Sequence, residues 1–187
     1  MFSSTKIEKA ITLALCVHKY QKRKGDGVTP YAVHPIGVAL LIARYTQNED
    51  VVCAAILHDV LEDTNYGSRR IKKIFGQKVF RLVKDVSDTR PNDPWDKRKD
   101  AYLKHLKTAS KEACLIACAD KINNLRAMES AYKKLGESLW KRFEASKEKK
   151  IKFYEDICRL VGNRFSHPIQ KELSRTLKEA KKSIKIK

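Results

Sequence analysis

A histidine and three carboxylates interrupt the end of an otherwise apolar segment, AAILHDVLEDT, at residues 54–64. The four polar groups are His58, Asp59, Glu62 and Asp63. An ionised carboxylate is costly to bury unless it is paired or bound to a metal ion. Residues four apart lie above one another on a helix, so these groups would line a single helix edge. The segment therefore predicts either a bound cation or, for Glu62 and Asp63, a solvated helix end.

Two other apolar segments also have a residue of metal-ligand type at one end. His34 begins HPIGVALLIARY, and Asp120 directly follows CLIACA. Divalent cations accept imidazole and carboxylate ligands, and two ligands alone do not make a site. Three apolar segments that each end in a ligand type favour a metal centre over a purely structural role. The candidate ligand set is His34, His58, Asp59 and Asp120.

Hydrophobic residues recur at helical spacing along most of the chain, which predicts an all-α fold of about eight helices. CLIACA is also predicted to be helical, because alanine and cysteine are poor strand formers and its flanks continue the helical period. We expect Asn48 to cap a helix that ends near Thr64, and Ser110 to cap a later one. A further helix is expected from the late 130s through Val161.

The bulk composition indicates one globular domain. The chain has 187 residues, of which 42% are hydrophobic and 33% charged, and no segment approaches the roughly 20 apolar residues that span a bilayer. The first residues lack the pattern of a signal peptide. Five scattered cysteines, an odd number, favour reduced thiols over a disulfide framework. We therefore expect a cytoplasmic protein without a membrane partner.

Basic residues exceed acidic ones by 40 to 22, a net charge of +18. This charge attracts polyanions such as phosphorylated small molecules, nucleic acid or acidic membrane surfaces. The net charge alone does not distinguish among these partners. The last stretch, KELSRTLKEAKKSIKIK, is rich in lysine. We expect one domain over residues 1–165 and a basic tail over residues 166–187, either solvated or a frayed helix. Attachment to nucleic acid or membrane is the less favoured interpretation of the tail.

Four segments together resemble the hydrolase domain of RelA/SpoT-type proteins, which are HD-domain phosphohydrolases. The resemblance covers about residues 5–160 and implies a single HD-domain helical bundle. In that group, a Glu-Asp pair shortly after the His-Asp motif distinguishes members that hydrolyse, and Glu62 and Asp63 occupy those positions. The matching segments are RKGDGVTPYAVHP (23–35), AAILHDVLEDT (54–64), FGQKVFRLVKDVSD (75–88) and ADKINNLRAM (119–128).

The resemblance implies a role for each candidate residue. The four ligands would hold Mn²⁺ or another divalent cation, and Glu62 and Asp63 would orient or deprotonate the attacking water. The chain departs from the family at Asn123, where histidine or tyrosine is common. The implied substrate contacts are Arg23, Lys24, Arg90 and Asn124.

The resemblance also implies a substrate and a reaction. Guanosine tetra- or pentaphosphate would lose its 3′-pyrophosphate and yield GDP or GTP, as in a small alarmone hydrolase. One alternative keeps the metal but acts on another nucleotide, for example as an NADPH 2′-phosphatase. A second alternative is a non-catalytic basic module that binds nucleic acid, which is disfavoured, although the net charge does not exclude it. The sequence leaves the oligomeric state open.

Overall fold

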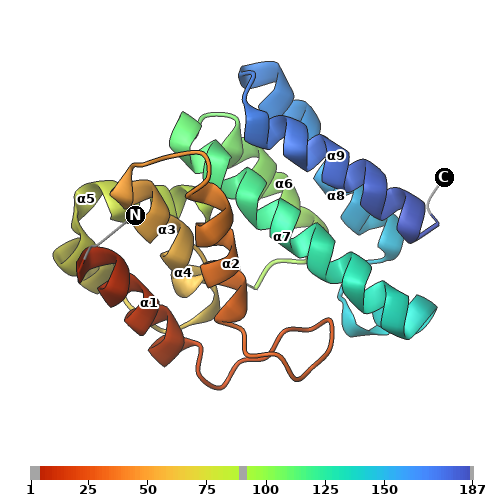
Figure 1. The fold of residues 1–187 in the computed structure, drawn as a ribbon, viewed down its shortest axis with the longest axis horizontal. Helices are drawn as coiled ribbons and strands as arrows, with labels where there is room; N and C mark the ends of the chain where they lie inside the picture. The colour runs from red at the N-terminus through yellow and green to blue at the C-terminus, as the bar shows by residue number, and fades with distance from the viewer. Residues whose placement is uncertain (1–4, 89–91, 186–187) are drawn as a thin grey trace.

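The computed structural model describes residues 5–88 and 92–185, which form helices and no strand (Figure 1). The predicted all-α fold is therefore confirmed. No helix in these ranges is long and apolar enough to cross a membrane. The elements are α1 (Thr5–Val17), α2 (Val33–Ile42), α3 (Glu49–Leu57), α4 (Val60–Asp63), α5 (Ser68–Val86), α6 (Trp95–Leu106), α7 (Lys111–Leu135), the 3₁₀ helix η1 (Gly136–Arg142), α8 (Lys147–Arg164) and α9 (Pro168–Ser183).

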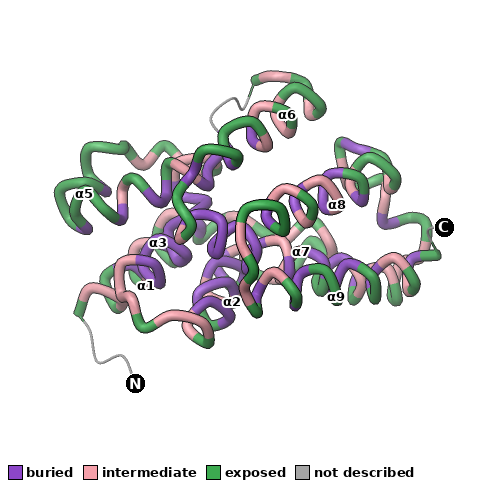
Figure 2. Tube along the Cα trace, turned by 90° about the horizontal axis from the view of Figure 1, so that it is seen from above, coloured by how far each residue is buried: buried purple, intermediate pink, exposed green. Residues whose placement is uncertain are grey.

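Helix α7 forms the centre of the molecule and packs against α2, α3, α5, α8 and α9 (Figure 1). Its first half, which contains CLIACA, is buried on all sides from Ala113 to Asp120. Helix α2 is almost entirely apolar and lies against α3 and α7. Figure 2 shows the buried residues gathered where these helices meet. The packing places Asp120 at the edge of the core, beside the first turn of α2.

Several predicted helix ends are confirmed, but the helix expected to run from Asn48 to Thr64 is wrong in one respect. The Asn48 side chain accepts a hydrogen bond from the Asp50 amide, as a helix cap does. However, α3 ends at Leu57, and α4 begins only at Val60, after Asp59 (φ −91°, ψ −6°). The stacking expected on one continuous helix therefore does not apply, because His58 and Glu62 lie on opposite sides of this break.

The helix expected from the late 130s through Val161 is also wrong at its start. Gly136, with φ +55°, ends α7 in a conformation that favours glycine. The chain then forms η1, and α8 begins only at Lys147, where the Ser146 hydroxyl accepts a hydrogen bond from the Lys149 amide.

Residues 168–183 form the packed helix α9, which contradicts the expected solvated tail or frayed helix. Leu173 and Ile169 are fully buried against the rest of the fold. Glu172 is also buried, and its carboxylate accepts hydrogen bonds from Arg126 and from the Tyr45 hydroxyl. The apolar stripe of α9 was missed because lysines fill the remaining positions. The predicted domain boundary at residue 165 falls in the connection between α8 and α9.

This packing gives a stability prediction. Leu173→Ala is expected to lower the free energy of unfolding by about 2–5 kcal/mol, because it removes a fully buried side chain. Urea unfolding followed by circular dichroism measures the change. The exposed Lys171→Ala on the same helix is the control and should shift stability by less than about 0.5 kcal/mol. Equal, small effects of both substitutions would contradict the packed arrangement of α9.

Candidate active site

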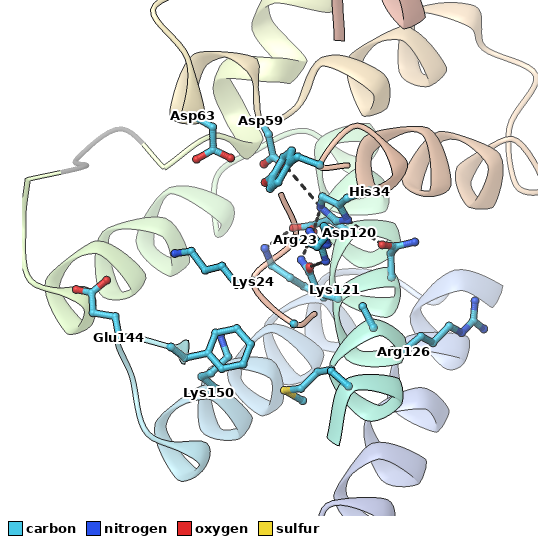
Figure 3. A pocket seen from close by; sticks show the side chains of 18 of the residues that line it. Arg23, Lys24, His34, Asp59, Asp63, Asp120, Lys121, Arg126, Glu144 and Lys150 are labelled. Carbon is cyan, nitrogen blue, oxygen red and sulfur yellow. Dashed lines mark hydrogen bonds and ion pairs between the residues drawn. The ribbon is translucent and has the colours of Figure 1, made fainter. Parts of the chain in front are cut away.

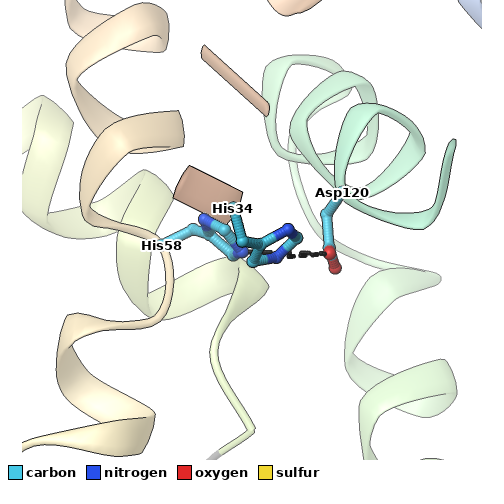
Figure 4. A group of neighbouring side chains, drawn as sticks. All are labelled: His34, His58 and Asp120. Carbon is cyan, nitrogen blue, oxygen red and sulfur yellow. Dashed lines mark ion pairs between the residues drawn. The ribbon is translucent and has the colours of Figure 1, made fainter. Parts of the chain in front are cut away.

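The four candidate ligands lie together where α2, α7 and the α3–α4 junction meet. Single ligand atoms of His34, His58 and Asp120 all lie within 4.8 Å of one another (Figure 4). Asp59 joins them, with Oδ2 3.1 Å from His58 Nε2 and 3.5 Å from His34 Nε2. His34 Nε2 also lies 3.2 Å from Asp120 Oδ1. Two imidazoles and two carboxylates, drawn from three separate parts of the chain, thus converge on one point.

Hydrogen bonds orient both imidazole rings toward this point. His58 Nδ1 lies 2.8 Å from the Ala55 carbonyl oxygen, and His34 Nδ1 lies 2.8 Å from Asn123 Oδ1. Both partners accept hydrogen bonds, so each Nδ1 donates a proton to its partner and each Nε2 faces the carboxylates. His58 Nε2 is buried and has no hydrogen-bond partner among the described residues. An orphaned ring nitrogen facing two carboxylates fits a divalent metal site.

Negative charge is concentrated in this cluster. Burial lowers the pKa of the His58 imidazole, but the carboxylates of Asp59 and Asp120 more than offset it and raise the pKa to about 9. Burial also opposes ionisation of Asp120, yet the Lys121 ammonium group beside it holds the pKa of that carboxyl well below its usual range. The field that stabilises protonated His58 attracts a cation in the same way.

Glu62 and Asp63 lie next to the ligand cluster on α4. Burial and the nearby Asp59 carboxylate raise the pKa of Glu62 to about 7. The same two causes raise the pKa of Asp63. Glu62 Oε2 accepts a hydrogen bond of 2.9 Å from the Asp88 amide, which positions this carboxylate. A carboxylate whose pKa lies near neutrality is suited to exchange protons with a reacting group.

The cluster opens into a cavity of about 930 Å³ (Figure 3). Its walls come from the loop after α1, from α2, α4 and α6, from the end of α5, from α7 from Asp120 onward and from α8. Of the candidate residues, those that line it are Arg23, Lys24, His34, Asp59, Glu62, Asp63, Asp120 and Asn124. A cavity of this size accommodates a small molecule such as a nucleotide.

The expected substrate contacts differ in their surroundings. Arg23 Nη2 donates a hydrogen bond of 2.8 Å to Asn124 Oδ1, and Asn124 Nδ2 donates one of 2.5 Å to Asp120 Oδ1. These two residues therefore connect the cavity wall to a candidate ligand. Lys24 is exposed and forms no ion pair with another described residue. Arg90 lies outside the described residues.

Four residues at the site were not among the candidates identified from the sequence: Tyr31, Gly37, Lys121 and Asn123. The Tyr31 hydroxyl donates a hydrogen bond of 2.7 Å to Asp59 Oδ2. Asn123 orients His34, and Gly37 leaves room for it, because a Cβ on Gly37 would lie 2.7 Å from Asn123 Nδ2. Lys121 forms an ion pair with Asp120. For Lys121 and Asn123, the sequence offers one clue: both follow the candidate ligand Asp120 within one helical turn.

Known proteins share this sequence pattern. Residues 10–148 match the HD domain family. The guanosine-3′,5′-bis(diphosphate) 3′-pyrophosphohydrolase MESH1 of Xenopus tropicalis is 38% identical over 125 residues, which cover 66% of this chain and 69% of that protein. The MESH1 protein of Drosophila melanogaster is 34% identical over 130 residues, which cover 68% of this chain and 72% of that protein.

The fold is shared as well. The structure of a metazoan orthologue of SpoT, described as hydrolysing ppGpp with a role in starvation responses, superimposes with a TM-score of 0.78. It is 26% identical in sequence, and the superposition covers 97% of each chain. The matched segment contains all four candidate ligands as well as Glu62 and Asp63. The chain therefore belongs to the HD domain family, in the group that includes the MESH1 pyrophosphohydrolases.

Proposed function

We propose that this chain is a metal-dependent 3′-pyrophosphohydrolase of guanosine tetra- and pentaphosphate. The observation that carries the proposal is the convergence of the His34 and His58 Nε2 atoms on the carboxylates of Asp59 and Asp120, next to a nucleotide-sized cavity. The relatives named above support the substrate class, because those proteins are pyrophosphohydrolases of guanosine-3′,5′-bis(diphosphate).

The reaction places water on the phosphorus attached to the 3′ oxygen. The bond between that phosphorus and the 3′ oxygen breaks, the 3′ oxygen takes up a proton, and the products are pyrophosphate and GDP or GTP. A divalent cation held by the four proposed ligands would supply positive charge for the phosphoryl oxygens and make water more acidic. Glu62 accepts the proton of the attacking water, Asp63 orients that water, and Arg23 and Lys24 neutralise phosphate oxygens.

The proposal includes Mn²⁺ as the metal and the cytoplasm as the location. The two carboxylates are ligands that suit Mn²⁺, and they offset its charge. All five cysteines are free thiols, three of them buried, which supports a reducing compartment.

The test is incubation of metal-stripped protein with guanosine tetraphosphate, with and without added Mn²⁺. We expect pyrophosphate and GDP to form only when Mn²⁺ is present, because the uncatalysed reaction is very slow. Chromatography of the nucleotides and an enzymatic assay for pyrophosphate measure the products. Parallel reactions with Mg²⁺ and Zn²⁺ rank the metals.

NADPH serves as the competing substrate in the same assay. Release of orthophosphate from NADPH, with guanosine tetraphosphate left intact, would assign the site to a 2′-phosphatase instead. Failure to turn over either nucleotide with any metal, combined with salt-dependent binding of RNA, would favour the non-catalytic nucleic-acid-binding module.

A further inference from the structure

Lys150, on the first part of α8, differs from the other basic residues that line the cavity. Most of the others pair with a neighbour or lie exposed: Lys99 lies 3.1 Å from Asp88, and Lys121 contacts Asp120. Lys150 is half-buried, and its ammonium group forms no ion pair or hydrogen bond with any residue in the described ranges. Its ammonium nitrogen lies 4.3 Å from the centroid of the Phe143 ring, so an aromatic face replaces part of its water.

The surroundings of Lys150 are positively charged. Burial lowers the pKa of its ammonium group to about 8, and four neighbouring cations add to the shift. The positive end of the α8 dipole is also unfavourable for a cation in this part of the helix. The four cations are Lys99, Lys121, Lys24 and Arg23. An anion would stabilise this half-buried ammonium group among like charges, and no carboxylate in the described part of the cavity wall pairs with it.

The position of Lys150 indicates which anion it would bind. Figure 3 shows Lys150 across the cavity from Asp59 and Asp63, with Lys24 between the two ends. Asp59, Asp120 and Lys150 all line this cavity, so the two ends belong to one site. A nucleotide with a phosphoryl group on the 3′ oxygen at the metal end must direct its 5′ phosphates elsewhere, since both groups branch from one ribose.

We propose that Lys150, assisted by Lys24, binds the 5′-phosphate groups of a nucleotide whose 3′-phosphoryl group lies at the ligand cluster. This inference rests on the proposed function and extends it. Lys150 makes the site selective for nucleotides phosphorylated at both the 3′ and the 5′ positions. A phosphate oxygen 2.7–2.9 Å from the ammonium nitrogen forms a charge-assisted hydrogen bond, which is the strong kind. The same contact removes the repulsion among the clustered cations.

Lys150→Met keeps the length of the side chain and removes its charge. We expect KM for guanosine tetraphosphate to rise about tenfold or more, with kcat within twofold, because a charge-assisted hydrogen bond to the substrate is lost. For guanosine 3′-diphosphate, which has a 5′ hydroxyl, KM should stay the same. Lys150→Arg should restore most of the affinity. Lys152→Met is the matched control, since Lys152 lies on the same helix, is 61% exposed and pairs with Asp156.

Binding of GDP to the metal-free protein, measured by calorimetry, separates this inference from the proposed function. We expect Lys150→Met to weaken GDP binding about tenfold, and Lys152→Met to leave it unchanged. This result would support the subsite even in a protein that hydrolysed no guanosine tetraphosphate.

Three outcomes would overturn the assignment. The first is an equal rise in KM for both substrates, and the second is unchanged binding of GDP and unchanged KM. The third is that pyrophosphate inhibits Lys150→Met more weakly than the wild type while KM for guanosine tetraphosphate is unchanged. This result would mean that Lys150 binds the pyrophosphate product instead. Thermal melting of each variant shows that the fold is intact, and loss of an unpaired ammonium group should not lower the melting temperature.

Discussion

Asp59→Ala is expected to lower kcat for guanosine tetraphosphate by about 10³-fold or more and to weaken Mn²⁺ binding. Asp59 Oδ2 lies within 3.5 Å of the Nε2 atoms of both His34 and His58, so its loss removes one proposed ligand and the negative charge beside the imidazoles. Steady-state kinetics and the metal content after dialysis measure the two effects. The α-helical circular dichroism spectrum should be retained.

Asp59→Asn provides a second variant that keeps an acceptor for the Tyr31 hydroxyl. That hydroxyl would otherwise lose its hydrogen bond, at a cost to stability of about 1–3 kcal/mol. Asp96→Ala is the control, because the Asp96 side chain is 59% exposed and pairs with Lys149, away from the cluster. If both Asp59 variants turned over substrate at the wild-type rate with a full complement of metal, the proposed ligand set would be wrong.

Glu62→Gln is expected to lower kcat by about 10²–10⁴-fold without loss of bound metal, because the amide cannot accept the proton of the attacking water. The glutamine oxygen can still accept the hydrogen bond that Glu62 Oε2 receives from the Asp88 amide, so the local structure should persist. Single-turnover kinetics with metal-loaded protein separates this chemical effect from substrate binding.

Glu144→Gln is the matched control for this experiment. Glu144 lines the same cavity, but its side chain is 54% exposed and bound to Arg98, 2.5 Å away. The kcat of Glu144→Gln should stay within about threefold of wild type, since the Glu144 carboxylate lies outside the ligand cluster. Loss of metal from Glu62→Gln in proportion to activity would instead identify Glu62 as a ligand. Asp63→Asn, assayed in parallel, tests the separate role proposed for Asp63.

Local patterns in the chain were sufficient for part of this description. The helical period predicted the all-α fold, and the caps at Asn48 and Ser110 were identified from residue type, because capping depends on a few neighbouring atoms. The candidate ligands were identified because ionisable groups at the ends of apolar segments are costly without a partner. Their proximity follows from the packing of α2 and α7 with the α3–α4 junction, and their role as ligands stays a prediction.

Contacts between distant segments required the three-dimensional arrangement. The hydrogen bond from His34 to Asn123 joins residues 89 positions apart, and no local period encodes such a pair. The same holds for α9, whose few apolar residues gain stability only by packing against α7 and α8. Lys150 was not singled out from the sequence, because its lack of an anionic partner depends on the position of α8 beside the cavity. The burial and the electrostatic environment of one residue depend on every element packed around it. The spacing of residues along the sequence gives information only about the helix that contains them.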